Sequence, residues 1–126
     1  MNTHIKRILI VDDEANILKS LQRILEDDFD VTIALGGVAA LEILNKTHQP
    51  FNLILSDLSM QEVNGIDIYR YVASHFPALK AQIIFMTGSA YTPDLKEFMS
   101  SIDNPCLEKP FKQEDLYQAI NDILTK

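Results

Sequence analysis

The chain has 126 residues, of which 47% are hydrophobic and 23% charged, and this balance predicts one folded domain rather than a disordered segment. The formal net charge of −7 argues against nonspecific binding to nucleic acid, because a phosphate backbone demands a basic surface, and it favours a metal cation as partner. The single cysteine excludes an intramolecular disulfide, and with no membrane-length apolar run and no signal-peptide core, we expect a cytoplasmic protein without a membrane partner.

Strand-like and helix-like segments alternate five times along the chain, which predicts an α/β fold, a doubly wound parallel sheet with helices on both faces. The expected strands are Arg7 to Val11, Phe29 to Ala34, Leu53 to Ser56, Gln82 to Met86, and Cys106 with Leu107. The expected helices are Glu14 to Glu26, Val38 to Lys46, a segment from Gly65 that ends before Pro77, a segment capped by Thr92 that reaches Ser101, and Gln113 to Leu124.

Reactive side chains follow several of the predicted strands. Asp12 and Asp13 end the first, Asp57 the third, Thr87 the fourth, and Lys109 follows the fifth. Because the carboxyl ends of parallel strands meet at one edge of a sheet, we expect these five side chains to gather there.

Three carboxylates within a few Å of one another repel, so the site should take up protons or bind a cation. All-oxygen donors without a nearby histidine or cysteine favour Mg²⁺, for which Mn²⁺ would substitute. Magnesium commonly completes its coordination with phosphate oxygens, and Thr87 and Lys109 supply a hydroxyl and a positive charge suited to a phosphoryl group.

Asp57 is the best placed nucleophile for such a group. A carboxylate can attack phosphorus to form an acyl phosphate without a separate base. Asp57 lies on the predicted central strand, whereas the adjacent Asp12 and Asp13 suit joint metal binding.

Simpler interpretations exist for each residue alone. Asp13 could cap the helix that starts near Glu14, Thr87 could be a strand-end hydroxyl, and Lys109 a surface lysine. A separate explanation would then be needed for every strand end, which favours a shared site. Cys106 is expected to be a small buried residue on an inner strand, without a redox role.

The motifs ILIVDDE, LILSDLSM, FMTGSA and LEKPF, in this order and with Gly65 eight residues after Asp57, resemble the receiver domain of two-component signalling. The resemblance covers essentially residues 1–126, which implies a single receiver domain with a CheY-like, flavodoxin-like (βα)5 sandwich of strand order 2-1-3-4-5. The segment from Ile83 to Phe111 is most similar to receivers of hybrid sensor histidine kinases.

This resemblance also implies residue roles. Asp13, Asp57 and the Ser59 backbone carbonyl would ligate Mg²⁺, and Asp12 would act mainly through water. Thr87 and Lys109 would bind phosphoryl oxygens, and the peptide bond from Lys109 to Pro110 would be cis. Two positions depart from the family pattern: Gln61 stands where proline is frequent, and Cys106 stands where many receivers carry a switching aromatic residue.

The leading hypothesis is therefore a phosphoacceptor that takes a phosphoryl group from a histidine kinase or a phosphotransfer protein onto Asp57 and regulates a protein effector. That effector acts in trans or lies in the same longer chain, and a phosphorylation-dependent dimer is left open. Small residues at Ser59 and Ser89 would leave water a path to the acyl phosphate. The chain would not be an enzyme beyond its own phosphorylation and dephosphorylation.

Three alternatives differ in kind. A degenerate receiver would act as a phosphorylation-independent binding module. A small Mg²⁺-dependent phosphohydrolase would need an acid–base carboxylate and a cap, for which no insertion is long enough. A flavodoxin-like nucleotide binder would need a glycine- or hydroxyl-rich first loop, where this chain carries Asp12, Asp13 and Glu14.

Overall fold

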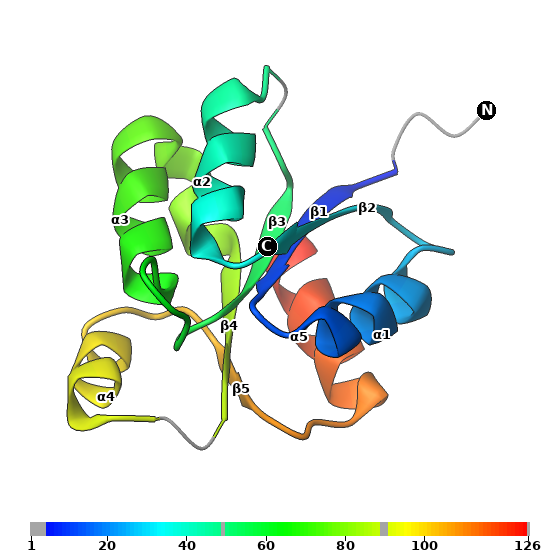
Figure 1. Cartoon of the computed structure of the whole chain (residues 1–126). Coiled ribbons are helices and arrows are strands. Elements are labelled where there is room, and N and C mark those ends of the chain that lie inside the picture. Colours follow the sequence, from blue (N-terminus) through cyan, green and yellow to red (C-terminus); the bar gives the residue numbers. More distant parts are fainter. Residues whose placement is uncertain (1–4, 49, 89–90, 126) are drawn as a thin grey trace.

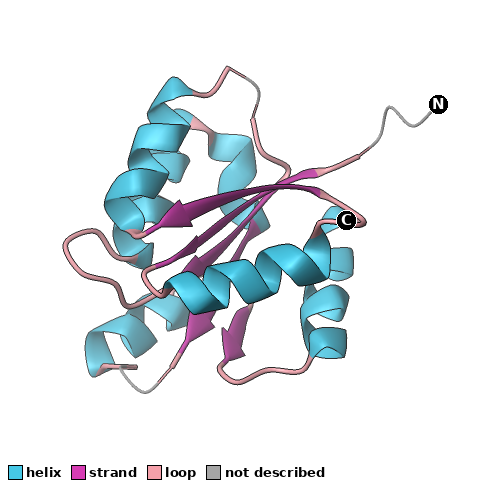
Figure 2. Cartoon of the chain, turned by 45° about the vertical axis from the view of Figure 1, so that its right-hand side comes forward, coloured by secondary structure: helices cyan, strands magenta, loops and turns pink. Residues whose placement is uncertain are grey.

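Five strands form one all-parallel sheet in the order β2-β1-β3-β4-β5, as predicted. The computed structural model describes residues 5–48, 50–88 and 91–125. In Figure 2 the arrowheads of the strands all point the same way. The strands are β1 (Arg7–Asp12), β2 (Asp30–Leu35), β3 (Leu53–Asp57), β4 (Ile83–Thr87) and β5 (Cys106–Glu108).

Helices cover both faces of this sheet (Figure 1). Helices α1 (Ala15–Leu25) and α5 (Gln113–Leu124) lie on one face. Helices α2 (Gly37–Lys46), α3 (Gly65–His75) and α4 (Pro93–Ser100) lie on the other, together with the 3-10 turn η1 (Pro77–Gln82). This doubly wound arrangement is the one the alternating pattern predicts.

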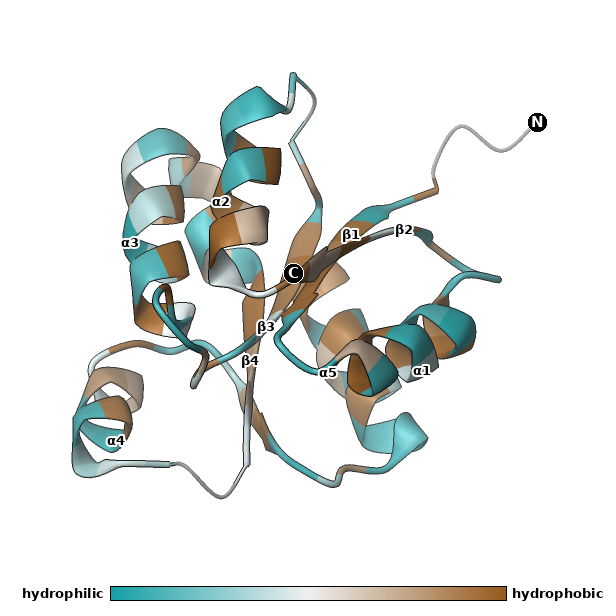
Figure 3. Cartoon of the chain, viewed as in Figure 1, coloured by the Kyte–Doolittle hydropathy of each residue, from teal (hydrophilic) through white to brown (hydrophobic). Residues whose placement is uncertain are grey.

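The core consists of two apolar layers separated by the sheet. All five residues of β3 and all five of β4 are buried, because these strands are covered on both faces. Figure 3 shows the central strand β3 and the upper part of β4 mainly in hydrophobic colours, and the helices with both hydrophobic and hydrophilic stretches. In α1, Leu18, Leu21 and Leu25 are buried, whereas Ile17 and Ile24 of the expected stripe are only half-buried.

Element boundaries differ from the predictions by small shifts. The second and fourth strands each lie one residue later than expected, and α5 has the expected bounds. The turn η1 begins at Pro77, where the sequence pattern predicts only the end of a helix. Thr92 caps α4 through a hydrogen bond from the Leu95 amide at 3.4 Å, as expected.

None of the helices in the described part of the chain is long and apolar enough to cross a membrane.

Candidate functional site

The predicted site residues lie together at the carboxyl edge of the sheet. Asp12, Asp57 and Thr87 are the last residues of β1, β3 and β4, and Lys109 directly follows β5. The parallel register brings these strand ends level with one another, with Asp57 opposite Met86 and Thr87 opposite Glu108. These four residues therefore lie at one edge of the sheet, where strand polarity predicts them.

Three carboxylates converge at this edge. One oxygen each from Asp12, Asp13 and Asp57 lies within 4.8 Å of the others. Asp12 is fully buried and Asp57 is 5% exposed, whereas Asp13 is open to solvent. The cluster is thus buried on the side of Asp12 and Asp57 and open to solvent on the side of Asp13, which gives small ligands access.

Lys109 lies between the two buried carboxylates. Its Nζ donates to Asp12 Oδ2 at 2.9 Å and to Asp57 Oδ2 at 3.1 Å. Its backbone amide donates to the Thr87 carbonyl at 2.7 Å, which ties the end of β5 to the end of β4. The expected cis peptide bond between Lys109 and Pro110 is confirmed.

The charges of this cluster shift the proton affinities of its members. Burial raises the pKa of Asp57, Lys109 acts in the opposite direction, and Asp12 adds to the increase. Burial lowers the pKa of Lys109, but its hydrogen bonds to Asp12 and Asp57 outweigh that effect and the pKa lies above its usual value. The positive charge of Lys109 only partly offsets the effect of burial on Asp57. A second cation near Asp57 would therefore stabilise its ionised carboxylate.

The donor set fits a hard divalent cation. Three carboxylates supply oxygen ligands only, and the exposed side at Asp13 leaves room for coordinated water. Magnesium prefers this combination of a few carboxylates with retained water, and zinc prefers nitrogen and sulfur.

The loop after Asp57 is held by backbone hydrogen bonds. The Leu58 amide donates to Met86 and the Gly65 amide donates to Leu58, each at 2.9 Å. The Ser59 amide approaches Asp57 Oδ1 at 3.4 Å. A Cβ on Gly65 would lie 2.8 Å from the Asp57 carbonyl oxygen, so glycine permits the helix to start this close to the site.

Asp13 does not cap α1, contrary to the simpler interpretation. The N-cap is Glu14, which makes no side-chain capping bond, and its amide donates to Asp12 Oδ1 at 2.9 Å. The buried Asp12 carboxylate thus holds the residue before α1, and the Asp13 side chain is the exposed member of the cluster.

The prediction that Cys106 lies on an inner strand is wrong. Cys106 begins β5, which is the edge strand of the sheet, and its side chain is half-buried against the core layer under α2, α3 and α4. Burial, with smaller contributions from Asp57 and Glu108, raises the pKa of the thiol to about 11. Such a thiol is poorly ionised near neutral pH.

Two further residues, Ser89 and Gly37, bear on the site. Ser89, expected near the site, lies outside the described residues. Gly37, which no prediction from the sequence assigns to the site, packs against Val63. The pair of adjacent glycines was the available signal.

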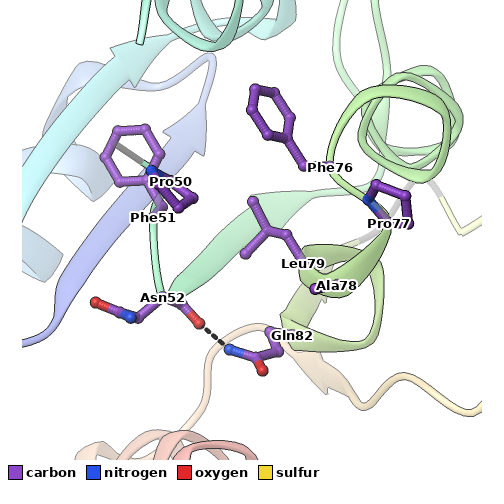
Figure 4. Close-up of a pocket in the computed structure, with 8 residues that line it drawn as sticks. All are labelled: Pro50, Phe51, Asn52, Phe76, Pro77, Ala78, Leu79 and Gln82. Carbon is purple, nitrogen blue, oxygen red and sulfur yellow. Dashed lines mark hydrogen bonds between the residues drawn. The ribbon is translucent and has the colours of Figure 1, made fainter. Parts of the chain in front are cut away.

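A hollow of about 360 Å³ lies at the opposite end of the strands from the carboxylate cluster (Figure 4). The residues before β3 and the turn η1 form it, with Phe51, Phe76 and Leu79 as its apolar wall. The Gln82 side-chain amide donates to the Asn52 carbonyl across this hollow. It has no part in the carboxylate site, because it lies at the amino ends of the strands.

Comparison with known proteins places this geometry in a family. Residues 8–121 match the family described as response regulator receiver domain. The chain is 34% identical over 120 residues to the response regulator receiver protein CpdR of Brucella abortus, covering 94% of this chain and 97% of CpdR. It is 30% identical over 118 residues to the transcriptional regulatory protein GlrR of Escherichia coli, covering 93% of this chain but only 26% of GlrR.

Among solved structures, a response regulator receiver domain protein from Clostridium thermocellum has a TM-score of 0.84 at 28% identity, covering 96% of this chain and 95% of that one. The chain therefore spans about a quarter of one curated relative and nearly all of another. Because the family match runs from the first strand into the last helix, this chain belongs to the response regulator receiver domains of two-component signalling.

Proposed function

We propose that this chain is a phosphoacceptor that receives a phosphoryl group on Asp57 in a Mg²⁺-dependent reaction and changes conformation to regulate a partner. The observation that carries the proposal is the buried Asp57 carboxylate, held 3.1 Å from Lys109 beside two further carboxylates at an open edge of the sheet. Membership of the receiver family supports the same chemistry.

The proposed donor is the phosphohistidine of a histidine kinase or a phosphotransfer protein. An Asp57 carboxylate oxygen attacks phosphorus, the new O–P bond forms as the N–P bond of phosphohistidine breaks, and the imidazole leaves with the electron pair. Lys109 and Thr87 are assigned to the phosphoryl oxygens, since both lie at the strand ends next to Asp57.

Asp13, Asp57 and the Ser59 carbonyl are assigned to Mg²⁺, with Asp12 acting mainly through water. Bound Mg²⁺, or Mn²⁺ in its place, would neutralise the charge that accumulates on the transferring group. Before transfer, Lys109 compensates both Asp12 and Asp57, so its Nζ is free to follow the phosphoryl oxygens only when another cation takes over that role.

The proposed output is a switch rather than turnover of an external substrate. A phosphoryl group adds negative charge and acceptor oxygens next to Thr87, which should draw in the end of β4 and alter the packing of α4, β5 and α5. We further propose one receiver domain over residues 1–126, a cytoplasmic location, and a protein effector. Attachment to a hybrid sensor kinase and phosphorylation-dependent dimerisation stay predictions.

The decisive experiment is incubation with Mg²⁺ and acetyl phosphate, followed by intact mass spectrometry. The wild type should gain one phosphoryl group, and Asp57→Asn should gain none. Exposed Asp103→Asn serves as a matched control and should label like the wild type. An unlabelled wild type, or equal labelling of Asp57→Asn, would contradict the proposal.

A further inference from the structure

Two loops meet beside the carboxylate cluster, and a glycine makes their contact possible. The connection between β2 and α2 consists of Gly36 and of Gly37, the first residue of α2, and the loop between β3 and α3 contains Val63. A Cβ on Gly37 would lie 2.1 Å from the Val63 carbonyl oxygen and 2.7 Å from both Cβ and Cγ1 of Val63. Real side chains do not approach this closely, so any other residue at position 37 must push the two loops apart.

Each loop is also fixed to a strand that ends in a site carboxylate. The Gly36 amide donates to the Asp12 carbonyl at 2.8 Å, which anchors the start of α2 to the end of β1. On the other side, Val63 belongs to the same short loop as Ser59, whose amide approaches Asp57. The contact of Gly37 with Val63 therefore joins the Asp12 side of the site to the Asp57 side.

The loop between β3 and α3, which contains Val63, is held by a tight turn. The Val63 amide donates to the Gln61 carbonyl at 2.8 Å, and between them Glu62 has a φ of 66°, which is uncommon for a residue with a side chain. A tight turn of this kind persists only where its surroundings hold it. Gln61, Glu62, Gly37 and Asp13 together border a hollow of about 330 Å³, so the turn lies beside the exposed carboxylate.

We propose that Gly37 is a positioning residue for the metal site: by letting α2 pack directly on Val63, it holds the loop that carries Ser59 in the metal-binding arrangement. The inference rests on the proposed function, because it assumes that Ser59 and the carboxylates bind Mg²⁺. It adds a residue that touches neither the metal nor the phosphoryl group. A Gly37→Ala substitution displaces the loop and weakens metal binding, while the carboxylates themselves stay unchanged.

The test compares Mg²⁺ affinities by NMR, with amide shifts recorded during a MgCl₂ titration that also shows that each variant is folded. Gly37→Ala should raise the dissociation constant about tenfold and should shift the amides of residues 58–63 even without metal. Val38→Ala is the matched control, because Val38 follows Gly37 in α2, is 44% exposed, and loses side-chain atoms without adding any near Val63. Its dissociation constant should stay within twofold of the wild type.

Val63→Gly approaches the same contact from the loop and leaves α2 intact. It should also weaken Mg²⁺ binding severalfold, and it decides the question alone if Gly37→Ala fails to fold. Unchanged affinity in both variants, or an equal loss in Val38→Ala, would overturn the role of Gly37 while leaving the proposed function standing. A wild type whose amides do not respond to Mg²⁺ would instead refute the metal site and this inference with it.

Discussion

Asp57 is a carboxyl group in an environment that disfavours its charge, since burial raises its pKa above the ordinary value of 3.8 despite the contact with Lys109. The folded chain therefore binds this proton more tightly than the unfolded chain does. Protonated Asp57 therefore contributes its full stabilisation at pH values below its pKa in the unfolded chain. This contribution is lost as the pH rises through its pKa in the folded chain. At neutral pH, the ionised Asp57 thus lowers the stability of the metal-free protein.

Replacing Asp57 by asparagine should then increase the free energy of unfolding at pH 7 without metal, by on the order of 1 kcal/mol. The gain should shrink as the pH falls toward the folded pKa, because the wild-type carboxyl becomes neutral as well. Urea unfolding at several pH values measures both effects. The control Asp103→Asn, in an exposed loop position, should change little, and a destabilised Asp57→Asn would show that the bond with Lys109 outweighs desolvation.

A second prediction concerns the reactivity of the Cys106 thiol. With a pKa of about 11, on the order of 0.1% of the thiol is ionised at pH 8, and only the thiolate reacts. Alkylation by iodoacetamide should be slow at pH 8, and its rate should keep increasing with pH beyond pH 9. Unfolding in urea should remove the shift, and a rate in the folded protein that levels off near pH 9 would contradict it.

Helix α3 shows how an element start is specified next to the site. Asn64 accepts from the Asp67 amide and the Asp67 carboxylate accepts from the Asn64 amide, both at 3.0 Å. This reciprocal capping box satisfies two helix N-terminal groups where the loop from Asp57 ends.

Asn64→Ala should therefore reduce the free energy of unfolding by about 1 kcal/mol. Urea unfolding measures the change. Asn121→Ala, at an exposed position inside α5, is the matched control and should stay within about 0.5 kcal/mol of the wild type. Equal stability of the two variants would mean that the capping box does not stabilise the helix start.

Helix α4 depends on few core contacts. Leu95 is its buried residue, and the Phe98 ring packs edge-on against Tyr69 at 5.3 Å and Phe85 at 5.7 Å between centroids. Aromatic contacts of this geometry contribute about 0.5 to 1.5 kcal/mol beyond buried area. An element attached this way opens more readily than the central strands.

Phe98→Ala should accelerate amide hydrogen exchange throughout α4 and leave exchange in α5 unchanged. Exposed Glu97→Ala, in the same helix, controls for helix propensity. Exchange that increases equally in α5 would instead indicate global destabilisation.

At the scale of the whole molecule, the predictable features were those with a local signal. The continuous apolar runs of β3 and β4 indicate central strands because burial on both faces demands apolar residues throughout. Strand polarity then places Asp12, Asp57 and Lys109 at one edge. The edge position of Cys106 follows from the strand order 2-1-3-4-5 that the family resemblance implies, and it contradicts the inner strand assumed for that residue. By contrast, the packing of Gly37 on Val63 depends on a contact between distant segments, which no local pattern reports.

Burial of the ionised Asp57 carboxylate at that edge reduces the stability of the free protein and should make stability depend on metal. A ligand that binds only the folded chain stabilises it by about 2.7 kcal/mol at a concentration one hundred times its dissociation constant. We expect Mg²⁺ to raise the urea midpoint accordingly. The effect should be largely lost in Asp13→Asn and Asp57→Asn, since each removes one of the clustered carboxylates. An equal response to Mg²⁺ in wild type and both variants would assign the stabilisation to general screening of the −7 charge rather than to this cluster.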